Sequence, residues 1–345
     1  MKTKYKLNKG ILISLIISFI LSLLFITGFF SNIQVRLSDG LYGGKSARED
    51  IVILAIDDKS LQEIGRWPWD RNTSADIITL LNNAKVVAVD VAFFEESDEE
   101  NDMLLADAIS YSHNVVVPME YVSYVRRDEK RGDEGDIVGN EKLLPIKDTR
   151  ESASGIGYIN IITDSDGVTR SLNLDIQGDY DSFVEKTYEI YTGNKFRSTN
   201  TRFLINFIGK PGSFNTYSFT DVLNGRINSS FFKDKAVFIG ATSPDLHDDY
   251  FVPTSLGKAM PGVEIHANTL QTMLNNDFLS HENYLVLIIT ILVSSLIATL
   301  IVYRFNTLVA SLMIVVLALV YVFISIKLFD YPKGFVPKPT SGRPS

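Results

Sequence analysis

Three long apolar segments divide the chain, and shorter apolar runs alternate with amphipathic stretches between them. The long segments are residues 11–30, 284–303 and 307–329. A helix of about 20 residues rises ~1.5 Å per residue and crosses a hydrocarbon core of ~30 Å. The pattern therefore predicts three membrane helices, one before and two after a middle segment of residues 31–283.

Charges beside these segments predict the orientation of the chain. The first segment is too long for a signal peptide and lacks a small-residue cleavage site, so we expect an uncleaved anchor with residues 1–10 in the cytoplasm. Counting crossings then places residues 31–283 outside the cytoplasm, Arg304 inside and the tail, residues 330–345, outside. The basic residues near the last helix favour the opposite side for that tail: Lys327, Lys333, Lys338 and Arg343.

The middle segment has the pattern of an α/β domain. Four runs are β-branched and nearly continuously apolar, as in parallel strands that are covered on both faces. A capping box at Ser60–Glu63, a cap at Thr73 or Ser74 and an amphipathic stretch at Asp102–Tyr111 predict helices between them. We therefore expect a mixed, mainly parallel sheet with flanking helices. The four strand runs are Ile51–Ile56, Val86–Phe93, Val115–Val117 and Ala236–Ile239.

The second half of the middle segment has a different pattern. In residues 155–176, apolar alternation on both sides of Asp164-Ser-Asp166-Gly167 predicts a β-hairpin insertion. Residues 183–191 are predicted to be helical and residues 203–208 to form a strand. Residues 126–135 are charge-dense and predict an exposed loop.

Composition excludes several classes of function. The net charge is -8, and the acidic residues lie almost entirely in the middle segment while the ends are basic. An acidic domain argues against nucleic acid as a partner. The chain has no cysteine, which excludes disulfides, thiolate metal sites and cysteine nucleophiles. Abundant Ile, Asn and Lys without cysteine fits a bacterial envelope protein, and the bilayer itself is the one partner that the helices require.

Six phrases occur together and in order, and they resemble one family. They are IDDKSLQEIGRWPWDR, KVVAVDVAFFE, GYINIITDSDGVTR, INFIGKPGSFNTYSFTDVLNG, KAVFIGAT and MPGVEIHANTLQTML. Together they look like a CHASE type-2 domain, a family of extracytoplasmic sensory domains of bacterial receptors, over about residues 31–280. The resemblance implies a ligand-binding sensor domain that commonly works as a homodimer.

The chain departs from the family pattern at its C-terminal side. Family members usually carry three membrane helices after the sensor and then a cyclase or kinase output module, whereas two helices follow here. Residues 332–345 read PKGFVPKPTSGRPS and predict neither a span nor a catalytic domain. The resemblance therefore implies a receptor truncated before its output domain, with no catalytic residues and no cofactor.

Acidic residues at strand ends are the first candidates for a ligand site. Asp57 and Asp58 follow the first strand, where ligands of open α/β sheets bind, and they equally suit a structural strand-to-helix turn. Asp90 interrupts an apolar strand, so it is either functional or part of a buried ion pair.

Aromatic and imidazole groups are the second set of candidates. Trp67 and Trp69 flank a proline beside Arg66, and they either bind a ligand or pack on the sheet while Arg66 pairs with Asp90. Nitrogen and oxygen groups of metal-ligand type gather in two phrases, although their spacing specifies no metal. These groups are Asp245, His247, Asp248 and Asp249, with Glu264 and His266.

The leading hypothesis is a membrane-anchored sensor that binds an unknown small molecule or protein and shifts the membrane helices. One alternative is an extracytoplasmic hydrolase that uses Asp57, Asp58, Asp90 and His266, although no Gly-x-Ser-x-Gly elbow is present. Another is a structural envelope protein that binds a partner through Trp67 and Trp69. Calcium at Asp164 and Asp166 is disfavoured because the downstream glutamate of a calcium loop is absent.

Overall fold

The computed structural model describes residues 2–127, 136–173, 176–177, 179–196, 202–279 and 284–329. These residues form two compact units, a helical unit from both ends of the chain (residues up to 41 and from 279) and an α/β unit of residues 42–278. The predicted tail, residues 330–345, and most of the predicted charged loop, residues 128–135, lie outside the described residues.

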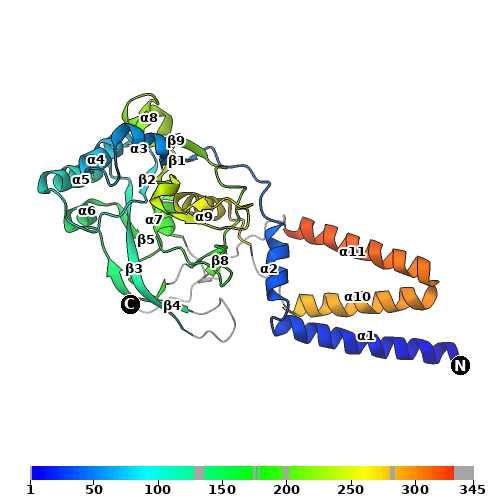
Figure 1. Ribbon diagram of the computed structural model, residues 1–345. Coiled ribbons are helices and arrows are strands. Elements are labelled where there is room, and N and C mark those ends of the chain that lie inside the picture. Colours follow the sequence, from blue (N-terminus) through cyan, green and yellow to red (C-terminus); the bar gives the residue numbers. More distant parts are fainter. Residues whose placement is uncertain are drawn as a thin grey trace. The chain divides into compact units, whose positions relative to one another are not determined.

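The helical unit contains α1 (Lys2–Ile26), α2 (Ser31–Asp39), α10 (Tyr284–Arg304) and α11 (Thr307–Phe329) (Figure 1). Within the described residues, three stretches are long and apolar enough to cross a membrane. They are Asn8–Ile26, Tyr284–Arg304 and Thr307–Lys327.

Helices α1 and α10 pack through small polar residues. Ser14, Ser18 and Ser22 follow one another at four-residue spacing, so they share one face of α1, and all three are buried. The Ser18 and Ser295 hydroxyl oxygens lie 2.5 Å apart. A Cβ at Gly10 would lie 3.3 Å from Thr299 Cγ2, so α1 and α10 run antiparallel. Small residues allow this close backbone approach, as is usual between membrane helices.

The α/β unit is built on an eight-stranded sheet within the described residues, with the strand order β7-β4-β3-β2-β10-β1-β9 and β5 beside β3. All neighbours pair in parallel except β3 and β4. The predicted mixed, mainly parallel fold is therefore confirmed. The strands are β1 (Ile51–Ile56), β2 (Val86–Val89), β3 (Val115–Arg127), β4 (Asp136–Leu143), β5 (Gly155–Tyr158), β7 (Ile176–Gln177), β9 (Asn215–Ser218) and β10 (Ala236–Ala241).

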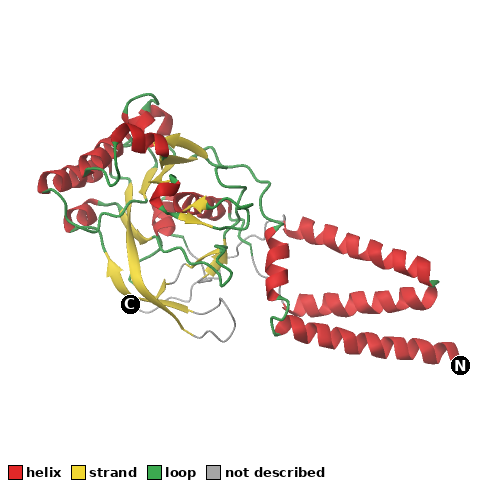
Figure 2. Ribbon diagram, viewed as in Figure 1, coloured by secondary structure: helices red, strands yellow, loops and turns green. Residues whose placement is uncertain are grey.

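Helices cover both faces of this sheet (Figure 2). One face packs against α4 (Arg71–Leu80), α5 (Glu99–Ser112) and α8 (Phe219–Leu223), and the other against α7 (Phe183–Thr192) and α9 (Gly262–Asn275). Ile51 and Ile53 point into the α7–α9 core, while Val52 and Leu54 point into the opposite core. The continuous apolar runs therefore reflect a sheet that is buried on both faces.

The remaining short elements complete the α/β unit. They are α3 (Asp58–Ile64), α6 (Lys147–Ser152), β6 (Ser171–Asn173), β8 (Arg202–Leu204), β11 (Asp249–Tyr250), β12 (Met260–Pro261) and two 3-10 turns, Ser229–Phe232 and Pro244–Leu246.

Helix starts differ from the predicted ones. The capping box at Ser60 is wrong, because Asp57 is the N-cap and Ser60 lies inside α3. Helix α4 begins at Arg71, before the predicted caps, and α5 begins at Glu99 after the cap Asp98. An aspartate precedes each helix, and the side chains of Asp57 and Asp98 cap α3 and α5, whereas Asp70 before α4 makes no side-chain cap bond. Strand β2 is also shorter than predicted and ends at Val89.

The predicted pairing within residues 155–176 is wrong. The turn at Asp164–Gly167 forms, with the Gly167 amide donating to the Asp164 carbonyl at 2.9 Å. Its flanking strands pair elsewhere, because β5 joins β3 in parallel and β6 joins β8. Consecutive antiparallel strands occur instead at β3 and β4 and at β11 and β12. Of the strand predicted at residues 203–208, only the start belongs to β8.

Candidate functional site at the carboxyl edge of the sheet

The parallel strands β1, β2 and β10 end at the same edge of the sheet. Asp57 and Asp58 follow β1, Asp90 follows β2, and Ser243 lies two residues after β10. The register aligns Ile56 with Ala241 and Val89 with Ile239, which brings these groups to neighbouring strand ends. Ligands of open α/β sheets gather at such an edge.

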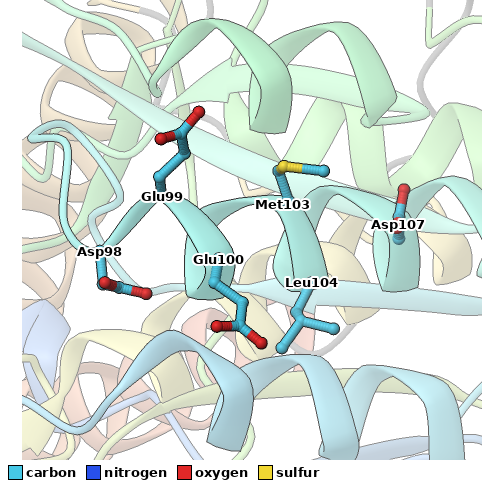
Figure 3. Close-up of a pocket in the computed structure, with 6 residues that line it drawn as sticks. All are labelled: Asp98, Glu99, Glu100, Met103, Leu104 and Asp107. Atoms are coloured by element: carbon cyan, nitrogen blue, oxygen red, sulfur yellow. The ribbon is translucent and has the colours of Figure 1, made fainter.

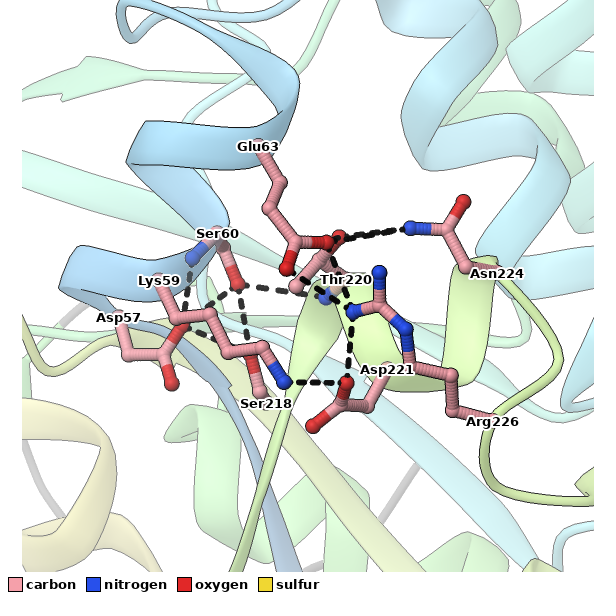
Figure 4. A network of polar contacts seen from close by, with 9 residues as sticks. All are labelled: Asp57, Lys59, Ser60, Glu63, Ser218, Thr220, Asp221, Asn224 and Arg226. Atoms are coloured by element: carbon pink, nitrogen blue, oxygen red, sulfur yellow. Dashed lines mark hydrogen bonds and ion pairs between the residues drawn. The ribbon is translucent and has the colours of Figure 1, made fainter.

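Asp57 makes three hydrogen bonds within the fold through one carboxylate oxygen (Figure 4). Its Oδ1 accepts from the Ser60 amide at 2.8 Å, the Ser60 hydroxyl at 2.6 Å and the Ser218 hydroxyl at 2.8 Å. Asp58 Oδ1 accepts from the Ser243 hydroxyl at 2.5 Å. These bonds fix α3 to the ends of β9 and β10, and a ligand role for either aspartate stays a prediction.

An outer ring of charges extends the same network to the surface. Arg226 lies 2.7 Å from Glu63 and 2.9 Å from Asp221, and Lys59 contacts Asp221 at 2.5 Å. The hydrogen bond from Arg226 lowers the pKa of Glu63, and that from Lys59 lowers the pKa of Asp221. Thr220 Oγ1 donates to Glu63 at 2.9 Å. The charges balance one another and join α3 to α8.

Asp90 lies in very different surroundings. Its side chain is 7% exposed, and its nearest partner is His266 on α9, whose Nε2 lies 3.9 Å from Asp90 Oδ2. That separation exceeds hydrogen-bond distance. Burial, reinforced by the Asp248 carboxylate, raises the pKa of Asp90 well above its usual value. This raised pKa favours the uncharged form of the Asp90 carboxyl.

Asp248 and Tyr250 complete this acid cluster, which we define as Asp90, Asp248, Tyr250 and His266. Burial raises the pKa of Asp248, while its hydrogen bond with the Tyr250 hydroxyl opposes that rise. Burial and the Asp248 charge also raise the pKa of Tyr250. The phenol therefore stays protonated and donates to the carboxylate.

His266 is a buried neutral imidazole. Its side chain is 3% exposed, and burial lowers its pKa to about 4. Its ring meets the Phe183 ring edge-on at 5.3 Å between centroids. Among the described residues, its Nδ1 has no hydrogen-bond partner. A buried polar atom without a partner costs free energy, so it marks a site that packing alone does not explain.

Two glycines allow α9 to approach the acid cluster. A Cβ at Gly262 would lie 2.5 Å from Asp248 Oδ2, and a Cβ at Gly240 would lie 2.7 Å from Val263 Cβ and 3.3 Å from Asp90 Cβ. The Gly262 amide donates to the Asp248 carbonyl at 2.9 Å. The first turn of α9 therefore rests directly on the cluster, with no room for a side chain between them.

Glu264 belongs to a separate contact of α9. Its carboxylate accepts from the Gly212 amide at 2.8 Å and from the Ser213 amide at 3.0 Å. Burial raises its pKa despite these amides. It therefore anchors the turn at residues 209–213 and does not share a ligand set with His266.

A scan against protein-family models matches the CHASE2 domain over residues 14–301. This match covers most of the chain and includes the α/β unit with the acid cluster. The chain belongs to the CHASE2 domain family. No curated protein and no solved structure matches it.

CHASE2 domains are extracytoplasmic sensory domains. The α/β unit is thus a sensory domain rather than a catalytic one, and the helices that could cross a membrane flank it in the sequence. The predicted family, fold class and sensory character of the chain are therefore confirmed.

The tryptophan loop of this CHASE2 domain packs on the sheet. Trp69 Nε1 donates to the Gly65 carbonyl at 2.8 Å, and its ring lies 5.0 Å from those of Trp67 and Phe219. Arg66 is exposed, and no ion pair between Arg66 and Asp90 occurs among the described residues. The expected pairing of Arg66 with Asp90 is therefore wrong, since His266 occupies that place.

Residues of metal-ligand type do not converge in the part of the CHASE2 domain that the structure describes, where no group of three such side chains is placed to hold an ion. Asp245 and His247 are exposed on the turn before β11. The guanidinium of Arg170 lies 2.8 Å from both Asp164 and Asp166, and a cation thus already neutralises the calcium-like turn.

A surface hollow on α5 offers no second constellation. It is lined by carboxylates and two apolar side chains from α5 and its N-cap (Figure 3). Acidic residues in the first turn stabilise a helix through its dipole, which accounts for Glu99 and Glu100. The six lining residues are Asp98, Glu99, Glu100, Met103, Leu104 and Asp107.

Sequence reasoning missed two members of the acid cluster as site residues. The sequence pattern places Asp248 among residues of metal-ligand type and does not single out Tyr250. The signal in the sequence is Tyr250, a tyrosine directly after an acidic run and some way before Gly262. Of the predicted site residues, the fold brings Asp90 and His266 together from segments far apart in the sequence.

Proposed function

We propose that this chain is the input part of a bacterial membrane receptor. In this proposal the CHASE2 domain lies outside the cytoplasm, α1, α10 and α11 cross the plasma membrane, and a change at the acid cluster is passed to α1 and α10. The observation that carries the proposal is a clamp between the two segments that connect the domain to these helices.

The clamp joins the segment before β1 to the end of α9. Lys45 Nζ lies 2.9 Å from Asp277 Oδ2. Gln271 Nε2 donates to the Ser46 carbonyl at 2.9 Å, and its Oε1 accepts from the Arg48 amide at 3.0 Å. The chain continues backward from this clamp into α2 and α1, and forward into α10. Both connections must therefore move together when α9 moves.

Helix α9 provides a route from the acid cluster to the clamp. Its first turn holds Gly262 against Asp248, its second turn holds His266, and its last turns hold Gln271 and Asn275. Every residue from Gly262 to Met273 is buried. A buried helix transmits a displacement because packed interiors do not deform continuously.

The hydrolase alternative receives less support. It needs Asp57, Asp58, Asp90 and His266 in one site, but the Asp57 oxygen that faces α3 already accepts three hydrogen bonds. The envelope-protein alternative needs displayed indoles, whereas Trp67 and Trp69 pack on the core.

Cross-linking in native membranes tests the coupling. Because the chain has no cysteine, Ser18→Cys with Ser295→Cys gives a single pair on α1 and α10. Adding Gln271→Ala removes two hydrogen bonds of ~1 kcal/mol each, and we expect the cross-linking rate at fixed pH to change about fivefold or more. Ser18→Cys with Ser294→Cys is the geometric control, since Ser294 is exposed.

Asn114→Ala is the matched control for general destabilisation. Its amide donates to the Ala84 carbonyl at 2.7 Å, between β3 and the end of α4, away from α9. We expect it to leave the cross-linking rate unchanged. Equal effects of both substitutions would show that the helices respond to loss of stability, and the coupling would then be rejected.

Single cysteines test the orientation. In intact cells, a membrane-impermeant thiol reagent should label Asp98→Cys on α5 and should label Arg304→Cys only after permeabilisation. Both positions are exposed. Labelling of Arg304→Cys in intact cells would contradict the proposed topology.

A further inference from the structure

The acid cluster is closely packed, and two of its side chains, Asp90 and His266, are buried. It is therefore not an open ligand-binding pocket. The Asp90 side chain is 7% exposed and that of His266 3%. Atoms of Asp248, Val263 and Asp90 already occupy the space beside Gly262 and Gly240. A species that binds here without opening the domain must be very small.

The polar groups of the cluster are also incompletely paired. No hydrogen bond joins the Asp90 carboxyl to another side chain among the described residues, and His266 Nδ1 has no partner there either. Asp248 bonds to the Tyr250 hydroxyl. Such an arrangement tolerates an uncharged Asp90 and strongly disfavours a charged one, because the neighbouring charge is another carboxylate.

We propose that the proton is the ligand of this CHASE2 domain, bound at Asp90 and released when the extracytoplasmic pH rises. This inference rests on the proposed receptor function and names its signal. Release leaves Asp90 as an anion beside Asp248, and their repulsion, with the entry of water to solvate the charge, displaces the first turn of α9.

Several elements pack around Asp90, and the groups that face it come from each of them. His266 faces it from α9, and Asp248 faces it from the loop before β11, with Tyr250 bonded to Asp248. Phe183 of α7 contacts His266 and carries no charge. Glu120 acts on Tyr250, and Asp249 acts on Asp248. Among the residues that the structure describes, no lysine or arginine acts on Asp90 to hold it in the charged form.

The sign of the pH effect follows from proton linkage. A carboxyl with a raised pKa binds its proton in the closed state and has lost it in the unfolded state, so stability falls as pH rises through that range. His266 contributes to the pH dependence of stability only below pH 6.5, its ordinary pKa. Above that pH the imidazole is neutral in both the folded and the unfolded chain. Above this pH, Asp90 increases the unfolding equilibrium constant by up to about tenfold per pH unit.

Fluorescence of the full chain in lipid nanodiscs tests proton binding. Both tryptophans of the chain, Trp67 and Trp69, lie in the CHASE2 domain, so their emission reports its unfolding in urea. Burial raises the pKa of Glu185 to about 7, and Glu185→Gln is therefore the background for all variants. The unfolding midpoint should fall between pH 6.5 and 8.5 in this background.

Asp90→Asn imitates the protonated acid and should remove this pH dependence. Asp98→Asn removes an exposed aspartate but preserves a good helix cap, and it should leave the dependence intact. An unchanged slope in Asp90→Asn overturns the proposal. If Asp90→Asn does not fold, infrared spectra of the wild-type chain with ¹³C-labelled aspartate provide the test. Absence of a protonated carboxyl band at pH 7 would also overturn the proposal.

Asp248→Asn provides a second variant with a directional expectation. Removing the neighbouring charge should move the titration of the infrared band to lower pH, and a shift to higher pH would contradict the proposed repulsion.

Spin labels at Phe29→Cys and Tyr284→Cys test whether proton release moves the membrane helices. Both positions are exposed. Their distance distribution should change over the same pH range and stay fixed in Asp90→Asn. A pH-dependent midpoint without a distance change would overturn the proton as a signal. The Gln271→Ala cross-linking result then decides separately whether the receptor function stands, since that experiment is performed at one pH.

Discussion

Two pairs of carboxylates lie at the carboxyl edge of the same sheet, yet their surroundings are opposite. Asp57 and Asp58 meet serine hydroxyls and a backbone amide that donate to them. Asp90 and Asp248 meet each other, a neutral imidazole and one phenol. The first pair accepts hydrogen bonds that organise a helix start. In the second pair the pKa of both carboxyls is raised, because few donors compensate for burial.

This difference shows that carboxylates at strand ends of one sheet do not share one chemical environment. The number of donors that face a carboxylate decides whether it acts as a structural anchor or as a proton-binding group. The contrast can be tested by removing members of each pair and measuring the free energy of unfolding in nanodiscs through tryptophan fluorescence.

Asp57→Ala should produce the largest loss of stability. It removes a helix cap and leaves the buried Ser60 without its acceptor, which together should cost about 3 to 4 kcal/mol. Asp90→Asn is the counterpart at the other pair and should cost less than about 1 kcal/mol at pH 7, since the amide resembles the protonated acid. Similar losses in both variants would contradict the contrast.

His266→Phe should produce the next largest effect, and only in acid. The pKa of His266 is about 4 in the folded domain and 6.5 in the unfolded chain. The free energy of unfolding therefore decreases as pH falls from 6.5 to 4, because the unfolded chain binds the proton first. This difference in pKa corresponds to a loss of about 3 kcal/mol in the free energy of unfolding of the wild type in acid. His266→Phe should not show this loss. Urea midpoints of both proteins at pH 4.5 and 7 measure the difference. Parallel pH profiles would mean that His266 is not held neutral.

Four strands of the central sheet, β1, β2, β3 and β10, could be predicted because each contains a local apolar run, whereas β4 and β9 are largely polar and were not predicted. Residues 51–56 form β1 as predicted, since a strand buried on both faces needs no information from elsewhere. Helix starts were harder, because Asp57 and Ser60 both suit an N-cap, and in the structure the Asp57 side chain accepts from the Ser60 amide and from Ser218. The pairing of β5 with β3 was missed because a turn sequence does not specify which strands lie beside it.

The acid cluster could be predicted only in part. Asp90 was visible as a lone charge in an apolar run, and His266 as an imidazole in an amphipathic helix. Their approach depends on Gly240 and Gly262, whose missing side chains let α9 reach the strand ends. That requirement is a property of packing between distant segments, and the sequence around each glycine does not reveal it.

Gly262→Ala tests this packing with an intermediate effect. The new Cβ would lie 2.5 Å from Asp248 Oδ2, and we expect a loss of about 2 kcal/mol from overpacking. Adding Asp248→Ala makes room, so the double variant should be more stable than the sum of the single losses by about 1 kcal/mol. An additive double variant would show that the strain lies elsewhere in α9.

Asp245→Ala should have the smallest effect, although Asp245 precedes Asp248 by only three residues. Asp245 is exposed on the turn Pro244–Leu246, and exposed substitutions usually change stability by less than about 0.5 kcal/mol. The unfolding midpoint should also be the same with added zinc or with a chelator, in wild type and variant alike. A zinc-dependent rise that Asp245→Ala removes would indicate a metal site at this turn, and would make exposure, rather than burial, the mark of the functional carboxylates at this edge of the sheet.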